Sequence, residues 1–508
     1  MPKRPASPNA MNSNNALQKT PIFLILLGLS AILLLTVPVM YSQLETISRD
    51  DDLMQLGSSG GDGMRQDEAL RRFRKQQKKK RRREKRNHNM DIPVGMSMGG
   101  GGGDNPKFLQ NIRDFAKWKH QEAQRRKQRG LLSSREEFEA NGGYGNDNLK
   151  DLKEHVRQTL RVPDRPSPPD VPYDIYNCPA HPPPKYPYAW NALKVLGHWN
   201  PDDTELPPTI HQSLCVFDWE TDQEKAYTYR EKQVPFVMQN VPEIMKTSMR
   251  WMSEGYLDKL LGDEAVRNEH SRNNHFMYWK TRYPQPDYEP PTEFVKLTYP
   301  EWKQKARKLD DQFGTKDTKL QQVDKEHWYF RLNCMLEQHG VFYEELPFFD
   351  PSLGETMTMI DPNQHRGINC RFGMKGVIAE THFDSSANFI TLMGGQRRYI
   401  LAHPSQCPNM ELYPQQHPSG RHSSVNWSTA AKEFEHVDRP FSHAQVNEIV
   451  MQAGDLLFLP TYWFHFIVSL NLNYQCNSRS GVSHEYDDFI AECGFGASTK
   501  QQRRGGHL

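Results

Sequence analysis

The chain has 508 residues, of which 36% are hydrophobic and 25% are charged, and its formal net charge is +2. Soluble globular domains contain about 45–50% apolar residues when glycine is counted, so part of this chain is expected to lie outside a packed core. The composition excludes a small disulfide-rich scaffold, because seven Cys are too few, and the odd number leaves at least one thiol free or paired with another chain.

The net charge hides an uneven distribution. Lys and Arg occupy 12 of the 16 positions from Arg71 to Arg86, and the remainder of the chain holds 52 basic and 61 acidic residues. A uniformly basic nucleic-acid-binding protein is therefore excluded, and we expect no direct binding to nucleic acid.

Residues 21–41 form an apolar segment that is long enough, with its flanks, to cross about 30 Å of hydrocarbon as a helix. A cleaved signal peptide would have a shorter apolar part and a small-x-small cleavage site. Basic residues precede the segment and three Asp follow it. The positive-inside rule then predicts a cytosolic tail over residues 1–20, a type II signal anchor, and a luminal remainder in the endoplasmic reticulum or Golgi.

Residues 42–184 resemble a low-complexity stalk. They contain a Gly/Ser segment, the basic run, five consecutive Gly and a Pro-rich stretch at 162–172. Such segments bury too little apolar surface to offset chain entropy, so we expect them to be disordered. The periodicity indicates two helices within the stalk, one over Phe108–Arg129 and one marked by Leu149, Leu152, Val156 and Leu160. For the basic run, the alternative interpretations are a nuclear localisation signal, a nucleic-acid-binding patch and attraction to anionic lipid headgroups.

A folded domain is predicted over residues 185–481, followed by a tail at 482–508. Helices come early and strands dominate late, which is typical of an α+β domain with an antiparallel barrel or sandwich as its core. The expected helices are Pro242–Trp251 and Leu257–Leu261, and the expected strands are Leu214–Phe217, Val234–Met238, Glu326–Leu332, Gly376–Phe383, Phe389–Leu392, Arg397–Leu401 and Leu456–Leu459.

The strongest chemical pattern is His382-Phe-Asp384 at the end of a predicted strand. Alternate residues of a strand share a face, so the imidazole and the carboxylate point the same way. An antiparallel return can bring His465 opposite His382. Two His and one carboxylate suit non-haem Fe(II). A second triplet, His436-Val-Asp438, lies in a charged stretch that ends in Pro, and we interpret it as a surface feature.

The segments Gly373–Asp384, Gly395–Leu401 and Gly454–His465, together with Asn388-Phe389, resemble the JmjC/cupin-like family of Fe(II)- and 2-oxoglutarate-dependent oxygenases. The arrangement is similar to that of the asparaginyl hydroxylase of hypoxia-inducible factor. The resemblance implies a double-stranded β-helix, a jelly roll with flanking helices, in which His382, Asp384 and His465 hold Fe(II).

The resemblance also implies a site for the cosubstrate 2-oxoglutarate, formed by Asn388, Asn477, Tyr329 and Arg397. Arg397 replaces the Lys of the asparaginyl hydroxylase, and a guanidinium can bind a carboxylate through two parallel hydrogen bonds. Arg398 points to the opposite face. Ala379 replaces a Thr, which leaves part of the cosubstrate hydrogen bonding open. Too few residues follow Gly481 for the dimerising helices of that hydroxylase, and the oligomeric state is not determined.

The predicted function is that of a 2-oxoglutarate-dependent dioxygenase that hydroxylates a protein substrate, with the modified residue type left open. The alternatives are a non-catalytic luminal binding or scaffold protein and a nuclear JmjC enzyme of the histone-demethylase type. Golgi glycosyltransferases share the layout of anchor, stalk and domain. This interpretation lacks support, because no Asp-x-Asp motif lies at the end of a convincing strand. Asn426-Trp-Ser428 is a glycosylation sequon that is usable only in the lumen, where Cys370, Cys407, Cys476 and Cys493 could also form disulfides.

Overall fold

The computed structural model describes residues 133–144, 149–198, 206–281, 285–313, 326–334 and 341–495, together with Tyr283 and a few positions between 121 and 130. All of them belong to the unit formed by residues 94–508. The predicted cytosolic tail, the apolar segment 21–41, the basic run and most of the predicted helix 108–129 lie outside the described residues. Within the described part of the chain, no helix has the length and apolar character needed to cross a membrane.

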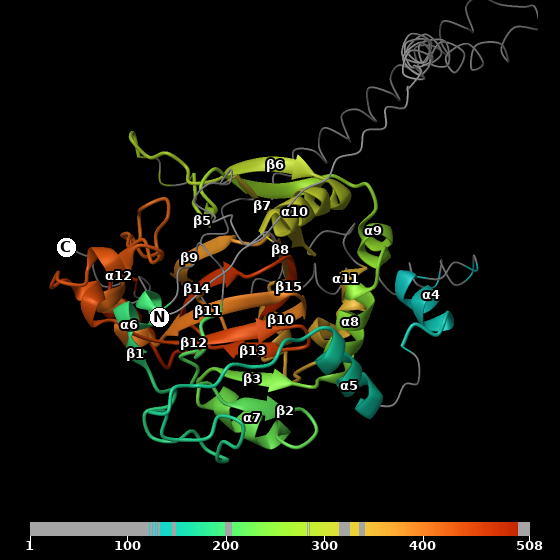
Figure 1. Ribbon diagram of the computed structural model, residues 1–508, viewed down its shortest axis with the longest axis horizontal. Coiled ribbons are helices and arrows are strands. Elements are labelled where there is room, and N and C mark those ends of the chain that lie inside the picture. Colours follow the sequence, from blue (N-terminus) through green and yellow to red (C-terminus); the bar gives the residue numbers. More distant parts are fainter. Residues whose placement is uncertain are drawn as a thin grey trace, which may run out of the picture. The chain divides into compact units, whose positions relative to one another are not determined.

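Two β-sheets form the centre of the domain (Figure 1). One has six strands in the order β1-β12-β11-β14-β9-β5, and the other has nine in the order β2-β3-β13-β10-β15-β8-β7-β4-β6. The strands are β1 (Trp190–Asn191), β2 (Val216–Asp218), β3 (Phe236–Gln239), β4 (Val266–Ser271), β5 (His275–Phe276), β6 (Glu293–Leu297), β7 (His327–Asn333), β8 (Ile368–Gly373), β9 (Ile378–Phe383), β10 (Asn388–Gly394), β11 (Gln396–Ala402), β12 (Gln445–Gln452), β13 (Leu456–Leu459), β14 (Phe464–Ser469) and β15 (Asn473–Arg479).

The two sheets face each other across a shared apolar core. This core combines Ile390 and Leu457 from the nine-stranded sheet with Tyr399 and Ile467 from the six-stranded sheet. Nearly all strand pairs are antiparallel, and β10 is buried along its whole length because it lies inside its sheet with elements on both faces. The predicted class, a cupin-like β-sandwich with flanking helices, is confirmed.

Helices flank the sheets, and each predicted helix and strand of the domain is present within one or two residues of its expected bounds. The helices are α4 (Ser134–Ala140), α5 (Leu149–Thr159), α6 (Ala192–Gly197), α7 (Gln223–Glu231), α8 (Pro242–Met252), α9 (Tyr256–Leu261), α10 (Tyr299–Phe313), α11 (Phe342–Glu345), α12 (Ala430–Glu433) and α13 (Asp487–Glu492). Short 3-10 helices are η4 (Pro347–Phe349), η5 (Pro351–Leu353), η6 (Pro362–Gln364), η7 (Pro404–Met410) and η8 (Pro440–His443).

Helix α8 is held between β10 and α11 by a buried carboxylate. Glu345 of α11 accepts hydrogen bonds from Arg250 Nε at 3.2 Å, Trp251 Nε1 at 3.2 Å and the Tyr256 hydroxyl at 2.7 Å. Three donors compensate for burying the charge, which would otherwise be costly. The contact links α8, α9 and α11 beside the nine-stranded sheet.

The packed region begins earlier than the expected boundary at residue 185. Leu152 and Val156 of α5 are buried against Met245 of α8, as their helical spacing requires. Farther along, Arg161 Nη1 forms an ion pair with the buried carboxylate of Asp455 at 3.0 Å. The composition of residues 149–184 predicts a stalk, but these residues pack on the domain. They do so through the narrow apolar stripe of α5 and through polar contacts such as the Arg161–Asp455 ion pair.

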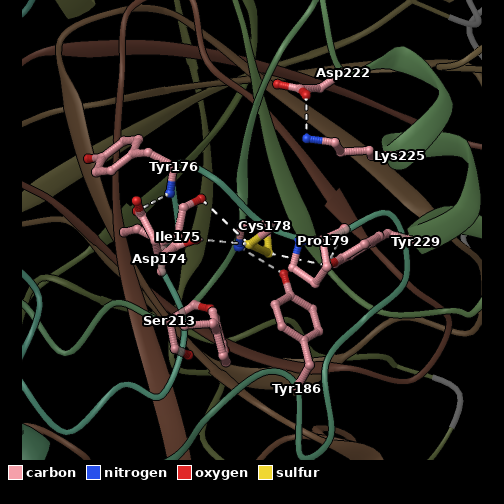
Figure 2. Close-up of a disulfide and its surroundings, with 12 residues drawn as sticks. Asp174, Ile175, Tyr176, Cys178, Pro179, Tyr186, Ser213, Asp222, Lys225 and Tyr229 are labelled. Atoms are coloured by element: carbon pink, nitrogen blue, oxygen red, sulfur yellow. Dashed lines mark hydrogen bonds and ion pairs between the residues drawn. A yellow bond between two sulfur atoms is a disulfide. The ribbon is translucent and has the colours of Figure 1, made fainter.

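A disulfide attaches this N-terminal segment to strand β2 (Figure 2). Cys178 is bonded to Cys215, one residue before β2. The Cys215 N–H donates to the Tyr186 hydroxyl at 2.9 Å, and the Tyr229 hydroxyl donates to the Pro179 carbonyl at 3.2 Å. The cross-link and its surrounding hydrogen bonds hold residues 178–186 against the sheet.

Two further disulfides lie in the later part of the chain. Cys370 and Cys476 face each other across β8 and β15, and Cys407 is bonded to Cys493. The second bridge follows α13, whose Ile490 is buried, so residues 487–493 of the predicted tail also pack on the domain. Cys334 is buried and unpaired, in agreement with the odd number of cysteines.

The disulfide pattern yields a direct measurement. Protein purified without reductant and denatured under argon is expected to show one reactive thiol per chain, from Cys334, and seven after reduction. A Cys334→Ser variant should then show none before reduction. Seven thiols in the unreduced wild-type protein would contradict the three pairings.

Candidate active site

The pairing of β9 with β14 brings two histidines together. His382 lies directly opposite His465 in the antiparallel register, and their ring centroids are 4.2 Å apart. Asp384 follows β9 by one residue, on the same side as His382. One ligand atom from each of His382, Asp384 and His465 lies within 4.8 Å of the other two. Across the described ranges, this is the one cluster of three His, Cys, Asp or Glu side chains with such spacing.

Backbone carbonyls orient both imidazoles. His382 Nδ1 lies 2.8 Å from the Glu380 oxygen, and His465 Nδ1 lies 3.1 Å from the Trp463 oxygen. A carbonyl oxygen can only accept, so each Nδ1 carries the proton and donates it. The Nε2 lone pair of each ring is therefore free to bind a metal, as in most histidine-metal sites.

The charges of the site favour its metal-binding protonation state. Burial lowers the pKa of His382 well below its ordinary value, and burial also lowers the pKa of His465. Burial alone would raise the pKa of Asp384, but the guanidinium groups of Arg479 and Arg421 outweigh it and hold that pKa well below its usual range. Two neutral imidazoles and one carboxylate are the forms that coordinate a divalent cation.

This donor set fits the metal that the sequence pattern predicts. Two imidazole nitrogens and one carboxylate oxygen suit a first-row ion such as Fe(II), and three donors leave further positions open to small molecules. Two of the three side chains are buried, since His465 is 3% and Asp384 is 6% exposed, and His382 is half-buried. The site can therefore hold a reactive metal with limited access to solvent.

A chain of hydrogen bonds connects the carboxylate of Asp384 to Arg397. Asn388 Nδ2 donates to Asp384 at 3.2 Å, and Asn477 Nδ2 donates to Asn388 at 2.9 Å. Gln475 Nε2 donates to Asn477 at 3.3 Å, and Arg397 Nη1 donates to Gln475. Each amide in this series both donates and accepts, so the orientation of one amide determines that of the next.

Arg397 is fully buried between the two sheets. It extends from β11 to the opposite sheet, where its Nη1 donates to the Tyr329 hydroxyl at 3.1 Å and its Nη2 donates to the Arg371 carbonyl at 2.8 Å. The structure thus brings together all seven side chains that the sequence analysis selected. Arg398 lies on the other face, where it forms a buried ion pair with Glu448 at 2.6 Å.

Several side chains on the same strand as the predicted Asn477 were not anticipated. Asn473, Gln475, Asn477 and Arg479 alternate along β15 and form a polar face in a buried strand. This period of two is visible in the sequence. Polar residues at alternate positions of a strand that is otherwise buried indicate a polar site inside the protein.

Arg421 and His422 come from the loop between β11 and β12, and no sequence pattern identifies them. His422 stacks on His382 with ring centroids 4.9 Å apart, and burial lowers the pKa of His422 to about 3. Arg421 donates to Asp384 at 3.0 Å from a left-handed backbone conformation, with φ of 72°. Only the folding of this loop over β9 brings both side chains to the site.

The second His-x-Asp triplet lies elsewhere. His436 and Asp438 are exposed in a turn after α12, as expected for a surface feature, and Asp438 contacts His443. Thr381, the nearest hydroxyl to the expected Thr position, is buried on the opposite face of β9, and no described residue is its hydrogen-bond partner.

Comparison with known proteins agrees with the fold. Residues 222–483, about half of the chain, match the model of the cupin-like domain family. The lysine-specific demethylase JMJ31 of Arabidopsis thaliana is 25% identical over 142 residues, which are 27% of this chain and 26% of the relative. Lysine-specific demethylase 8 of Xenopus tropicalis is 32% identical over 111 residues, 21% of this chain and 23% of the relative.

A third relative is named for a different reaction. The tRNA wybutosine-synthesizing protein 5 of Gallus gallus is 31% identical over 99 residues, 20% of this chain and 29% of the relative. The matches thus span about a quarter of each relative's length. The family match, the sandwich of two antiparallel sheets and the JmjC-type relatives lead to one conclusion: the chain belongs to the JmjC/cupin-like family, whose members are typically Fe(II)- and 2-oxoglutarate-dependent oxygenases.

Proposed function

We propose that this protein is an active Fe(II)- and 2-oxoglutarate-dependent oxygenase that hydroxylates a protein substrate. The observation that carries the proposal is the register of β9 and β14, which sets His382 opposite His465 with both Nε2 atoms free beside Asp384. A non-catalytic binding protein has no need for this combination of free lone pairs and a charged carboxylate.

In this proposal, His382, Asp384 and His465 hold Fe(II), which when bound supplies the oxygen chemistry that couples decarboxylation of the cosubstrate to hydroxylation of a C–H bond. Arg397 binds the distal carboxylate of 2-oxoglutarate, and the Tyr329 hydroxyl supports that contact. Asn388 and Asn477 orient the end of the cosubstrate near the metal. The two sheets exclude bulk water from this interior, which strengthens each polar contact.

We further propose that the domain lies in the lumen of the endoplasmic reticulum or Golgi, behind a type II anchor at residues 21–41. Three disulfides support this location, because such bonds persist in oxidising compartments and are rare in the cytosol and nucleus. The sequon residue Asn426 is exposed in the structure and thus accessible to glycosylation.

Lysine demethylation is a second candidate, since two relatives are named lysine-specific demethylases. Hydroxylation of an N-methyl group releases formaldehyde, whereas hydroxylation of a side-chain carbon adds one oxygen to the product. Mass analysis of the modified protein together with a formaldehyde assay therefore separates the two candidates.

The proposed activity predicts iron-dependent turnover. The full-length protein with Fe(II) is expected to convert 2-oxoglutarate to succinate, and Asp384→Ala should abolish both this turnover and stoichiometric iron binding. Asp438→Ala is the matched control, because it removes the carboxylate of the exposed His-x-Asp triplet. An equal loss in both variants, or iron-independent turnover, would contradict the proposed metal centre.

The role of Arg397 predicts a change in cosubstrate affinity. Arg397→Gln removes a charged hydrogen-bonding group worth about 2 kcal/mol, so the KM for 2-oxoglutarate should rise roughly 30-fold. Arg397→Lys keeps the charge and should raise KM less. Steady-state kinetics at saturating iron would measure both values, and an unchanged KM in Arg397→Gln would exclude this residue as the carboxylate ligand.

The luminal location predicts N-glycosylation. Protein from eukaryotic cells should lose mass on treatment with a glycosidase, and Asn426→Gln should remove the shift. Proteolysis of intact microsomes provides the independent check, in which the domain should be protected. Digestion of the domain from the cytosolic side would overturn the proposed orientation.

A further inference from the structure

The inner face of the nine-stranded sheet carries an unusual concentration of arginines. Arg331 of β7 and Arg371 of β8 are direct cross-strand partners in the register, and Arg479 lies at the end of the neighbouring strand β15. Like charges directly opposite each other on adjacent strands destabilise a sheet. A fold that retains this pair between its two sheets indicates that a negative group compensates for it in the working state.

The nearby acids do not balance these charges. Arg421 and Arg479 each donate to Asp384 at 3.0 Å, and Arg331 forms an ion pair with Glu269. Arg371 donates to its neighbour's carbonyl oxygen in Cys370, and its pKa falls to about 10 through burial and the nearby Arg479 and Arg397.

Among the described residues, the five arginines 331, 371, 397, 421 and 479 outnumber by three the two carboxylates that they contact, Asp384 and Glu269. The imidazoles of His382 and His465 add no charge, since a histidine binds a metal in its neutral form. A divalent metal and the dianion 2-oxoglutarate cancel each other when both are bound. The excess of positive charge therefore persists when metal and 2-oxoglutarate are both bound, and it requires a third partner that is an anion.

Hydrogen-bond donors without an acceptor lie within this arginine cluster. Within the described part of the chain, the Nε atoms of Arg421 and Arg479 are buried and have no acceptor. The side chains of Arg331, Arg479 and Arg421 are 25%, 22% and 16% exposed, so the cluster reaches the outside of the site. A buried donor without an acceptor is costly, and an oxyanion would satisfy several donors at once.

Resting on the function proposed above, we propose that the substrate is an acidic protein segment that presents a carboxylate to Arg331, Arg371 and Arg479 beside the metal centre. The same charges repel methylated lysine, which is a cation. Nucleic acid is the less favoured polyanion, because the chain outside the basic run has nine more acidic than basic residues and a phosphate backbone requires a broad basic surface.

The test is to isolate, from a pool of random heptapeptides, those that bind the full-length protein. The protein carries Fe(II) and 2-oxoglutarate and is kept under argon, so that no turnover occurs. Asp and Glu should be enriched at least tenfold over Asn and Gln at one position or more. Arg331→Gln and Arg371→Gln should each reduce this ratio to below threefold. Arg272→Gln, which alters an exposed arginine paired with Glu293, is the matched control and should retain the wild-type ratio.

Folding of each variant is checked by thermal unfolding, and a second measurement uses the wild-type protein alone. Free aspartate and sulfate should compete with a selected acidic peptide, since all present oxyanions. Enrichment of Lys, lack of any acidic enrichment, or an unchanged ratio in both arginine variants would overturn the proposal. Stabilisation by free aspartate without peptide enrichment would assign the carboxylate to a small acid and exclude the protein substrate.

Turnover of 2-oxoglutarate is measured in the same preparations. Loss of acidic selection with intact wild-type turnover would refute only the substrate class. Absence of iron binding and turnover in the wild-type protein would refute the oxygenase itself, whatever the peptides show.

Discussion

The antiparallel register between β9 and β14 is the constraint on which the rest of the site depends. It fixes His382 opposite His465, while the carbonyls of Glu380 and Trp463 turn both Nε2 atoms toward the same point. A shift of one residue would move one imidazole to the opposite face of the sheet, because side chains alternate along a strand. The apolar core between the sheets maintains this register.

The polar interior is arranged around that pair. Asp384 keeps its charge in a buried position because two guanidinium groups contact it, and a series of amides joins it to Arg397. The candidate metal ligand Asp384 and the proposed cosubstrate anchor Arg397 are thus parts of one hydrogen-bonded network that spans both sheets. Networks of this kind are rigid when fully satisfied, which suits a site that must hold its ligands in a defined geometry. The excess of arginines at its edge is the feature from which we infer an acidic substrate.

The edges of the domain were less predictable than its centre. Strands with continuous apolar runs, such as β10 and β13, are apparent in the sequence because their burial is nearly complete. Residues 149–184 instead attach through two apolar side chains of α5, the Arg161–Asp455 ion pair and the Cys178–Cys215 disulfide. The partners in these contacts lie more than 35 positions away in the sequence. The local composition of residues 149–184 therefore predicts a stalk, because it contains no sign of these distant partners. The same holds for the helix after residue 486, which the Cys407–Cys493 bridge attaches to the domain.

The sequence by itself indicated an α+β domain with an antiparallel barrel or sandwich, and strand periodicity placed His382 and Asp384 on one face. The resemblance to the JmjC/cupin-like family implied the jelly roll and the choice of His465 as the third ligand. Alternation along a strand showed only that Arg397 and Arg398 point to opposite faces, and the family resemblance implied that Arg397 is the inward one. Only the tertiary structure decided which cysteines pair, that Arg421 and His422 reach the site from a loop, and that Arg331 meets Arg371. Those contacts arise from strand order and loop path, which depend on how the two sheets close on each other and have no signature in the local sequence.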